Sequence, residues 1–220
     1  MYRGNKLRLL SGAGSVFLGL GLVLYPQIEK MLLDSKQKKL IAAFEMIGEK
    51  NSTTITSSTA GGGKDTSLED GIRGVILIPR IDAAIPIFEG ADEKSLSLGV
   101  SMIEPEKQFG VHNVGIAGHR AFAYGKQFNR LDELSVNDEI EIKTQQGNYK
   151  FVVDQTLIVD RTEVEVLRDK SNPYITLVTC TPIGEENPKK RLIVQAKLKV
   201  NGIKKTELNG MKRGNDEKKI

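Results

Sequence analysis

The spacing of hydrophobic residues changes twice along the chain, and each change predicts a different kind of element. Residues 9–28 contain no charged side chain. At 1.5 Å per residue, a helix over this run matches a hydrocarbon layer about 30 Å thick, which predicts a transmembrane helix. Residues 27–50 place apolar side chains at helix-like intervals. That pattern predicts an amphipathic stalk helix, with a core helix of the folded domain as the alternative.

The next change in composition predicts where the folded domain begins. Residues 51–67 are rich in Ser, Thr and Gly and contain hardly any apolar side chains, which is typical of a flexible linker. We therefore expect four parts. A cytoplasmic tip and transmembrane anchor cover residues 1–28, and a stalk helix with linker covers residues 29–71. A folded domain covers residues 72–200, and a polar basic tail covers residues 201–220.

Beyond the linker, the pattern is that of strands. Apolar and polar residues alternate, or β-branched residues gather, in short segments separated by Gly, Pro and Asn. These segments are residues 74–90, 112–120, 138–160, 175–180 and 191–200. Short helices are expected at residues 92–98 and 129–134. About eight strands at this spacing predict an all-β domain folded as an eight-stranded barrel with short helices.

The flanks of the apolar run predict its orientation. Basic residues at positions 3, 6 and 8 precede the run, whereas Glu29, Lys30 and Asp34 follow it. By the positive-inside rule the N-terminus stays in the cytoplasm, so we expect a single-pass protein of the cell membrane whose folded domain is extracellular. A cleaved signal peptide is the alternative, and it too would export the domain.

Composition and charge narrow the function classes. The chain has 39% hydrophobic and 27% charged residues, as globular proteins do. The net charge is +4, but residues 201–220 alone carry six Lys and Arg. A charge run of this kind is usually a solvated tail. We therefore predict no nucleic-acid partner.

One thiol stands in a setting that favours chemistry. Cys180 is the only cysteine, so no intrachain disulfide can form. It ends the strand at residues 175–180, and Arg191 begins the next strand after a ten-residue loop. If the two strands pair antiparallel, Cys180 and Arg191 are neighbours at one rim of the barrel. A nearby cation favours the reactive thiolate, and a guanidinium can hold a developing oxyanion.

A proton carrier that works near neutral pH is also needed, and histidine suits that role. The chain contains two, His112 and His119. They lie seven residues apart in one predicted strand, so they face opposite sides. His119 stands at the end of the strand, after Gly118, where functional groups collect. We therefore assign His119 to the site and treat His112 as a surface residue.

Each of these residues also has an ordinary interpretation. Cys180 alone fits a buried strand position, Arg191 alone fits a surface ion pair with Glu185 or Glu186, and His119 alone fits a partly buried imidazole with satisfied hydrogen bonds. Their joint placement at strand ends in an exported chain favours catalysis.

These residues resemble a known family. Thr176-Leu177-Val178-Thr179-Cys180 matches the TLxTC signature of the sortases. Ile116-Ala117-Gly118-His119 resembles the sortase histidine segment, and Arg191 falls where the sortase arginine follows the cysteine. The resemblance covers roughly residues 72–200. The residues around His119 and at 124–131 look most similar to class D sortases, with class A next.

The resemblance implies an activity and its partners. Sortases have an eight-stranded barrel and cleave an LPxT-type C-terminal sorting signal after its Thr. Carried onto this chain, Cys180 is the nucleophile that forms a thioester, His119 is the acid and base, Arg191 steadies the substrate or the oxyanion, and Thr179 helps to position the substrate. The implied partners are surface proteins with LPxT-like signals, an amine of a lipid II-type peptidoglycan precursor, and the membrane.

No metal or cofactor is expected. Some class A sortases bind calcium through acidic loop residues, and Glu104, Glu106, Asp160 and Glu163 are acidic residues in loop positions, but no calcium site is predicted from them. Two other functions remain open. A papain-like endopeptidase is disfavoured, because such enzymes place the Cys before the His, at a helix N-terminus. A non-catalytic, membrane-tethered β-barrel that binds the cell wall is the alternative from another class.

Overall fold

The computed structural model describes residues 71–120 and 127–199, a helix over residues 34–46, and short helical pieces between residues 19 and 32. Most of the predicted anchor at residues 9–28 lies outside the described residues, as do the predicted linker and basic tail. Among the residues that are described, no helix combines the length and the apolarity that a membrane crossing needs. The chain divides into two compact units, residues 1–39 and 40–220.

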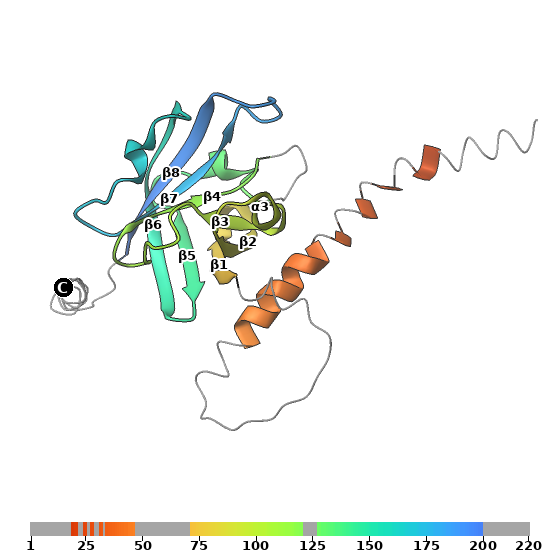
Figure 1. Cartoon of the computed structure of the whole chain (residues 1–220), viewed down its shortest axis with the longest axis horizontal. Coiled ribbons are helices and arrows are strands. Elements are labelled where there is room, and N and C mark those ends of the chain that lie inside the picture. The colour runs from red at the N-terminus through yellow and green to blue at the C-terminus, as the bar shows by residue number, and fades with distance from the viewer. Residues whose placement is uncertain are drawn as a thin grey trace, which may run out of the picture. The chain divides into compact units, whose positions relative to one another are not determined.

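The predicted eight-stranded barrel is confirmed. Its strands are β1 (Ile72–Ile78), β2 (Ala83–Glu89), β3 (Val100–Met102), β4 (Asn113–Ala117), β5 (Glu139–Thr144), β6 (Gly147–Asp160), β7 (Tyr174–Thr181) and β8 (Lys190–Leu198). Around the barrel they follow the order β1-β2-β3-β4-β7-β8-β6-β5, which closes on itself (Figure 1). Closure leaves no free sheet edge among these strands.

Parallel pairing of β4 with β7 positions the site. Their register aligns Asn113 with Tyr174 and Ala117 with Val178. Because parallel strands have their carboxyl ends at the same edge of a sheet, the segments that follow β4 and end β7 meet at one end of the barrel. His119 comes two residues after the end of β4, and Cys180 is the second-last residue of β7. His119 and Cys180, which are 61 residues apart in the chain, thus lie at the same end of the barrel.

Side-chain alternation separates a core from an outer face. In β7, Ile175 and Leu177 are fully buried in the main hydrophobic cluster, together with Leu192 and Val194 of β8. Since successive side chains of a strand point to opposite faces, the residues between them point out of the barrel. Cys180 therefore lies on the outer face.

The short elements follow local signals. The helix expected at residues 92–98 is α3 (Glu93–Leu98), which crosses from β2 to the parallel strand β3. Its N-cap is Asp92, whose carboxylate accepts hydrogen bonds from the backbone N–H and hydroxyl of Ser95 at 2.9 and 2.8 Å. These bonds, the backbone one first, lower the pKa of Asp92. The helix expected at residues 129–134 is the 3-10 turn η2 (Leu131–Glu133).

Three elements were not predicted from the sequence. Strand β3 has only three residues, which is too short for alternation to be visible. The 3-10 turns η1 (Pro79–Ile81) and η3 (Val164–Leu167) also lack a clear periodic pattern. The turn η3 matters most, because it belongs to the connection between β6 and β7 and lies next to β4. A Cβ placed on Gly115 of β4 would stand 2.8 Å from Cδ2 of Leu167.

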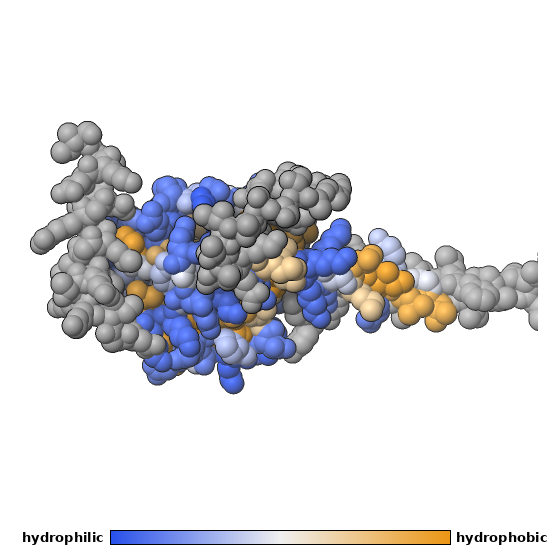
Figure 2. All heavy atoms as spheres, turned by 90° about the horizontal axis from the view of Figure 1, so that it is seen from below, coloured by the Kyte–Doolittle hydropathy of each residue, from blue (hydrophilic) through white to orange (hydrophobic). Residues whose placement is uncertain are grey.

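Apolar residues upstream of the barrel fall into two groups. Phe44 is 6% exposed and joins a small buried cluster with Ile72, Val75 and Phe88, all within the unit of residues 40–220. Other large apolar side chains of the helical residues are exposed, among them Leu20, Leu24, Tyr25, Ile28, Met31, Leu32 and Met46. In Figure 2 the barrel is mostly hydrophilic, and apolar side chains gather along these helical residues.

Candidate active site

Cys180 and Arg191 are direct cross-strand partners, as the sequence predicted. The antiparallel register of β7 and β8 aligns Cys180 with Arg191, followed by Thr179 with Leu192 and Val178 with Ile193. Directly opposite residues in an antiparallel pair have Cβ atoms about 5 Å apart. Both side chains are partly exposed. The thiol is therefore within reach of a solvent-borne peptide, and its cross-strand partner carries a permanent positive charge.

The Arg191 guanidinium is held by backbone carbonyls. Nη1 donates to the carbonyl oxygens of Pro188 and Lys190, at 2.7 and 2.9 Å. Within residues 127–199, no ion pair joins Arg191 to Glu185 or Glu186, so the ordinary interpretation of this arginine has no support. One end of the planar fork is fixed by the loop before β8, and its other N–H donors remain to bind an acceptor such as a peptide carbonyl.

His119 reaches the same edge from β4. It is exposed, and its backbone N–H donates to Oε1 of Gln127 at 2.7 Å. Its carbonyl accepts from the N–H of Phe128 at 3.2 Å. The β4–β7 ladder continues past Ala117, since the N–H of Gly118 donates to the carbonyl of Val178 at 3.1 Å. If the register continued by one more residue, His119 would lie opposite Cys180.

Thr179 has a structural contact. Its side chain is 2% exposed, and its hydroxyl donates to the carbonyl of Gly118 at 2.7 Å. This bond ties the two segments that lead to His119 and Cys180. The hydroxyl is thus engaged in a bond within the protein. The expectation that Thr179 contacts substrate stays a prediction.

His112 lies at the other end of β4. Its Nδ1 accepts from the backbone N–H of Gln108 at 3.0 Å, and its carbonyl accepts from the N–H of Tyr174, the first residue of β7. The length of β4 separates it from Cys180. His112 therefore stabilises the turn before β4.

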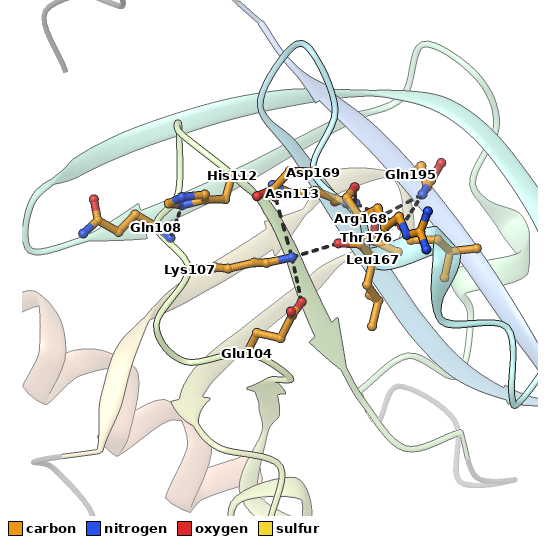
Figure 3. Close-up of polar contacts among 11 residues, drawn as sticks. Glu104, Lys107, Gln108, His112, Asn113, Leu167, Arg168, Asp169, Thr176 and Gln195 are labelled. Atoms are coloured by element: carbon orange, nitrogen blue, oxygen red, sulfur yellow. Dashed lines mark hydrogen bonds and ion pairs between the residues drawn. The ribbon is translucent and has the colours of Figure 1, made fainter. Parts of the chain in front are cut away.

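A network of polar groups holds the connection between β6 and β7, and sequence reasoning missed it (Figure 3). Asn113 is fully buried. Its Nδ2 donates to the carbonyls of Val166 and Arg168, both at 3.0 Å, and its Oδ1 accepts from the hydroxyl of Thr176 at 2.7 Å. Gln195 adds a bond from Nε2 to the carbonyl of Val166 at 2.8 Å. The sequence carries no signal for this network, because its members come from four separate segments.

Lys107 joins the same connection from another side (Figure 3). Its ammonium donates to the carbonyl of Leu167 at 2.8 Å, and it lies 2.8 Å from a carboxylate oxygen of Glu104 and 3.6 Å from Asp169. The Glu104 contact is an ion pair without hydrogen-bond geometry. The Lys107 side chain is 14% exposed. One cation thus links the loop before β4 to the loop before β7.

A second lysine packs at the start of β7. Lys170 lies with its Nζ 4.2 Å from the centroid of the Tyr174 ring and donates to Oε1 of Gln195 at 2.6 Å. Burial lowers the pKa of Lys170, and the nearby Asp154 acts in the opposite direction.

Among the described residues, no three His, Cys, Asp or Glu side chains gather as a metal site would require.

Comparison with known proteins agrees with the motifs. The family model for the sortase domain matches residues 76–199. Sortase D of Bacillus subtilis is 29% identical over 168 residues, which cover 74% of this chain and 81% of that protein. Sortase A of Listeria monocytogenes is 25% identical over 146 residues, which cover 66% of this chain. These are the two classes that the motifs resemble.

Solved structures agree with the fold. The structure of a Clostridium perfringens sortase D5 transpeptidase is similar, with a TM-score of 0.56, 27% identity, and coverage of 75% of this chain and 99% of that one. The chain spans 64% of the length of the Listeria sortase A and 59% of that of a Bacillus anthracis sortase A. Because the family model covers more than half of the 220 residues, the chain belongs to the sortase family.

Proposed function

We propose that this protein is a membrane-anchored cysteine transpeptidase. It cleaves an LPxT-type sorting signal after the Thr and transfers the surface protein to an amine of a lipid II-type peptidoglycan precursor. The observation that carries this proposal is the direct pairing of Cys180 with Arg191 at strand ends, on the edge to which β4 leads His119. Family membership supports it, because the similar proteins include a sortase that is described as a transpeptidase.

The first half of the reaction forms a thioester. The Cys180 sulfur attacks the carbonyl carbon of the substrate Thr, and the free donors of the Arg191 guanidinium bind the oxygen that becomes negative. The tetrahedral intermediate then collapses. The carbon–nitrogen bond breaks, the His119 imidazolium gives its proton to the departing amine, and the acyl group stays on sulfur.

The second half transfers the acyl group. His119, now neutral, accepts a proton from the incoming amine as the amine nitrogen attacks the thioester carbon. A new amide bond forms, the carbon–sulfur bond breaks, and Cys180 leaves as thiolate beside the imidazolium. Each bond broken is matched by one formed, so no oxidant, reductant or metal is required.

The anchor is part of the proposal. Exposed apolar side chains of the described helical residues, such as Leu20, Leu24 and Ile28, would be covered by a bilayer. With the basic residues near the N-terminus, this arrangement supports a single crossing with the barrel outside the cell. We expect the full chain to stay with membranes after alkaline extraction, and its release into the supernatant would contradict the anchor.

The decisive experiment captures the acyl-enzyme. The full chain in detergent is mixed with an LPxT-type peptide, without added amine, and its mass is measured. We expect a mass increase equal to the acyl fragment in the unmodified protein and none in Cys180→Ala. Cleavage of the peptide by Cys180→Ala would rule out the nucleophile assignment.

The two histidines provide a matched pair of variants. His119→Ala should lower turnover by at least about a hundredfold, because a general acid and base is lost. His112→Ala removes an imidazole of the same size that only accepts a bond from Gln108, so turnover should stay close to that of the unmodified protein. Equal loss in both variants would contradict the role of His119.

The guanidinium is tested by a substitution that keeps its charge. Arg191→Lys loses the planar fork, so it cannot bond the Pro188 carbonyl and an oxyanion together, and turnover should fall about tenfold or more. Lys190→Arg is the control on the neighbouring residue, which is exposed and pairs with Asp160. Near-normal turnover in Arg191→Lys would show that charge alone is sufficient.

A further inference from the structure

Arg120, the residue after His119, is buried against the end of β7. Its side chain is 8% exposed and contacts three groups. Nη1 donates to the hydroxyl oxygen of Thr181 at 3.1 Å, Nε donates to the carbonyl of Asn129 at 3.4 Å, and Nη2 pairs with Asp132 at 2.8 Å. The exposed motif residue His119 is thus followed by a largely buried guanidinium that is held by three protein groups.

The Thr181 contact continues the register of the two parallel strands. The ladder aligns Ala117 with Val178, and a further backbone bond runs from Gly118 to Val178. The same offset of 61 residues pairs Arg120 with Thr181. The residues one position earlier on each segment are His119 and Cys180. The Arg120–Thr181 bond therefore joins the two segments directly after His119 and Cys180, the proposed imidazole–thiol pair.

We propose that Arg120 is a positioning residue for the reaction of Cys180. It holds the segment carrying His119 against the segment carrying Cys180 and thereby sets the separation of imidazole and sulfur. This inference rests on the proposed function of these two residues. Each of its three guanidinium nitrogens already contacts a protein group, Thr181, Asn129 or Asp132, and the side chain is 8% exposed, so we assign Arg120 a role through position and not through contact with substrate.

The fork of the guanidinium is what the position requires. Three acceptors lie in three directions around Arg120, and only a planar group with donors on all three nitrogens reaches them at once. A lysine ammonium is a single point of charge on a flexible stem. It can keep the ion pair with Asp132, but it then leaves the Thr181 hydroxyl without its donor. Arg120→Lys therefore tests position and not charge.

The kinetic test compares four variants of the full chain. In Arg120→Lys and Thr181→Val, we expect kcat for an LPxT-type peptide to fall about tenfold to hundredfold, as small misplacements of reacting groups do. KM should change less than about threefold, because substrate binding is not altered. Thr181→Ser keeps the acceptor oxygen and should retain kcat within about threefold. Arg130→Lys is the matched control, since Arg130 also pairs with a carboxylate, Glu133, and with a carbonyl, that of Ile81.

A second readout needs no peptide. Cys180 is the only thiol, so its alkylation by iodoacetamide can be followed by mass spectrometry across a pH series. Loosening the imidazole–thiol pair should shift the pH midpoint of alkylation in Arg120→Lys and Thr181→Val. A purely structural role would lower stability and leave this midpoint unchanged, as expected for Arg130→Lys.

The outcomes separate the two proposals. If the unmodified protein does not cleave the peptide, the proposed function fails, while the alkylation series still tests Arg120. If Arg120→Lys does not fold, the Thr181 pair decides the question. Equal kcat and equal alkylation midpoints in Thr181→Val and Thr181→Ser, or an Arg120→Lys variant that matches the unmodified protein, would overturn the inference.

Discussion

Asn113→Ala is the most direct test of the polar network that holds the connection between β6 and β7. The substitution removes an amide that donates to the carbonyls of Val166 and Arg168 and accepts from the hydroxyl of Thr176. The backbone bond from the Asn113 N–H to Asp169 is kept. The variant therefore deletes side-chain bonds without changing the strand.

The size of the effect follows from those bonds. A hydrogen bond inside a protein contributes about 1 kcal/mol net, and a buried partner left unsatisfied costs about 1–3 kcal/mol. The Thr176 hydroxyl can still use the Val166 carbonyl, which lies 3.3 Å away, whereas the Arg168 carbonyl loses its amide donor. We therefore expect a loss of about 3 kcal/mol in the free energy of unfolding. For a domain of this size, that corresponds to a fall in Tm of about 10 °C.

Two assays measure the global and the local effect. Urea unfolding should show a midpoint lower by about 1–2 M with an unchanged slope, since the surface exposed on unfolding is the same. Limited trypsin digestion should cleave faster after Arg168 and Lys170, because these residues lie in the connection that Asn113 holds. Asn148→Ala is the control, because Asn148 is exposed on the β5–β6 hairpin.

The reasoning fails if the two alanine variants behave alike. Asn148→Ala should change stability by less than about 0.5 kcal/mol, as exposed substitutions usually do. If Asn113→Ala falls in the same range, the amide contributes no net free energy and water replaces it without cost. If stability falls but cleavage after Arg168 does not increase, the connection is held by Lys107 and Gln195 instead.

Two further predictions concern stability. Gly118→Ala places a Cβ 2.7 Å from Cδ2 of Phe128 and 2.8 Å from Cγ1 of Val100, so thermal unfolding should show a loss of about 1–3 kcal/mol in the free energy of unfolding. Gly71→Ala is the control, because its Cβ would meet open space. Equal Tm values in the two variants would show that Phe128 moves freely. Asp92→Ala removes the N-cap carboxylate of α3, whose pKa is lowered by its bonds from Ser95. A carboxylate with a lowered folded-state pKa contributes fully to stability above its unfolded pKa of about 4 and loses that contribution as the pH falls through its lower folded-state pKa. The difference in urea midpoint between the unmodified protein and Asp92→Ala should therefore be present at pH 7 and shrink as the pH falls through the lowered pKa of Asp92, and a constant difference would contradict the assignment.

Local patterns were sufficient where a single segment carries the information. The alternation in residues 138–160 predicted the β5–β6 hairpin, and the structure turns at residues 145 and 146 as expected. The β-branched run before Cys180 and the Gly-Pro loop after it predicted the antiparallel pairing with Arg191. Both are nearest-neighbour connections in the chain, so their partners follow from order alone.

Long-range placement was beyond those patterns. Strand β3 has three residues and was not predicted, although it separates β2 from β4 in the barrel. Nothing in the sequence marks Asn113 as the donor to a loop 53 residues away, or Arg120 as a partner of Thr181. Such contacts depend on which strands become neighbours when the barrel closes.

The sequence by itself determined which groups are available: one thiol, two imidazoles, and a strand order that brings Cys180 next to Arg191. Only the tertiary structure decided that β4 runs parallel to β7, which brings His119 to the same edge and sends His112 to the opposite end. The physical reason is that side-chain alternation and turn residues act over a few positions. Parallel pairing instead joins strands that are distant in the chain, and it is selected by the burial of the whole core.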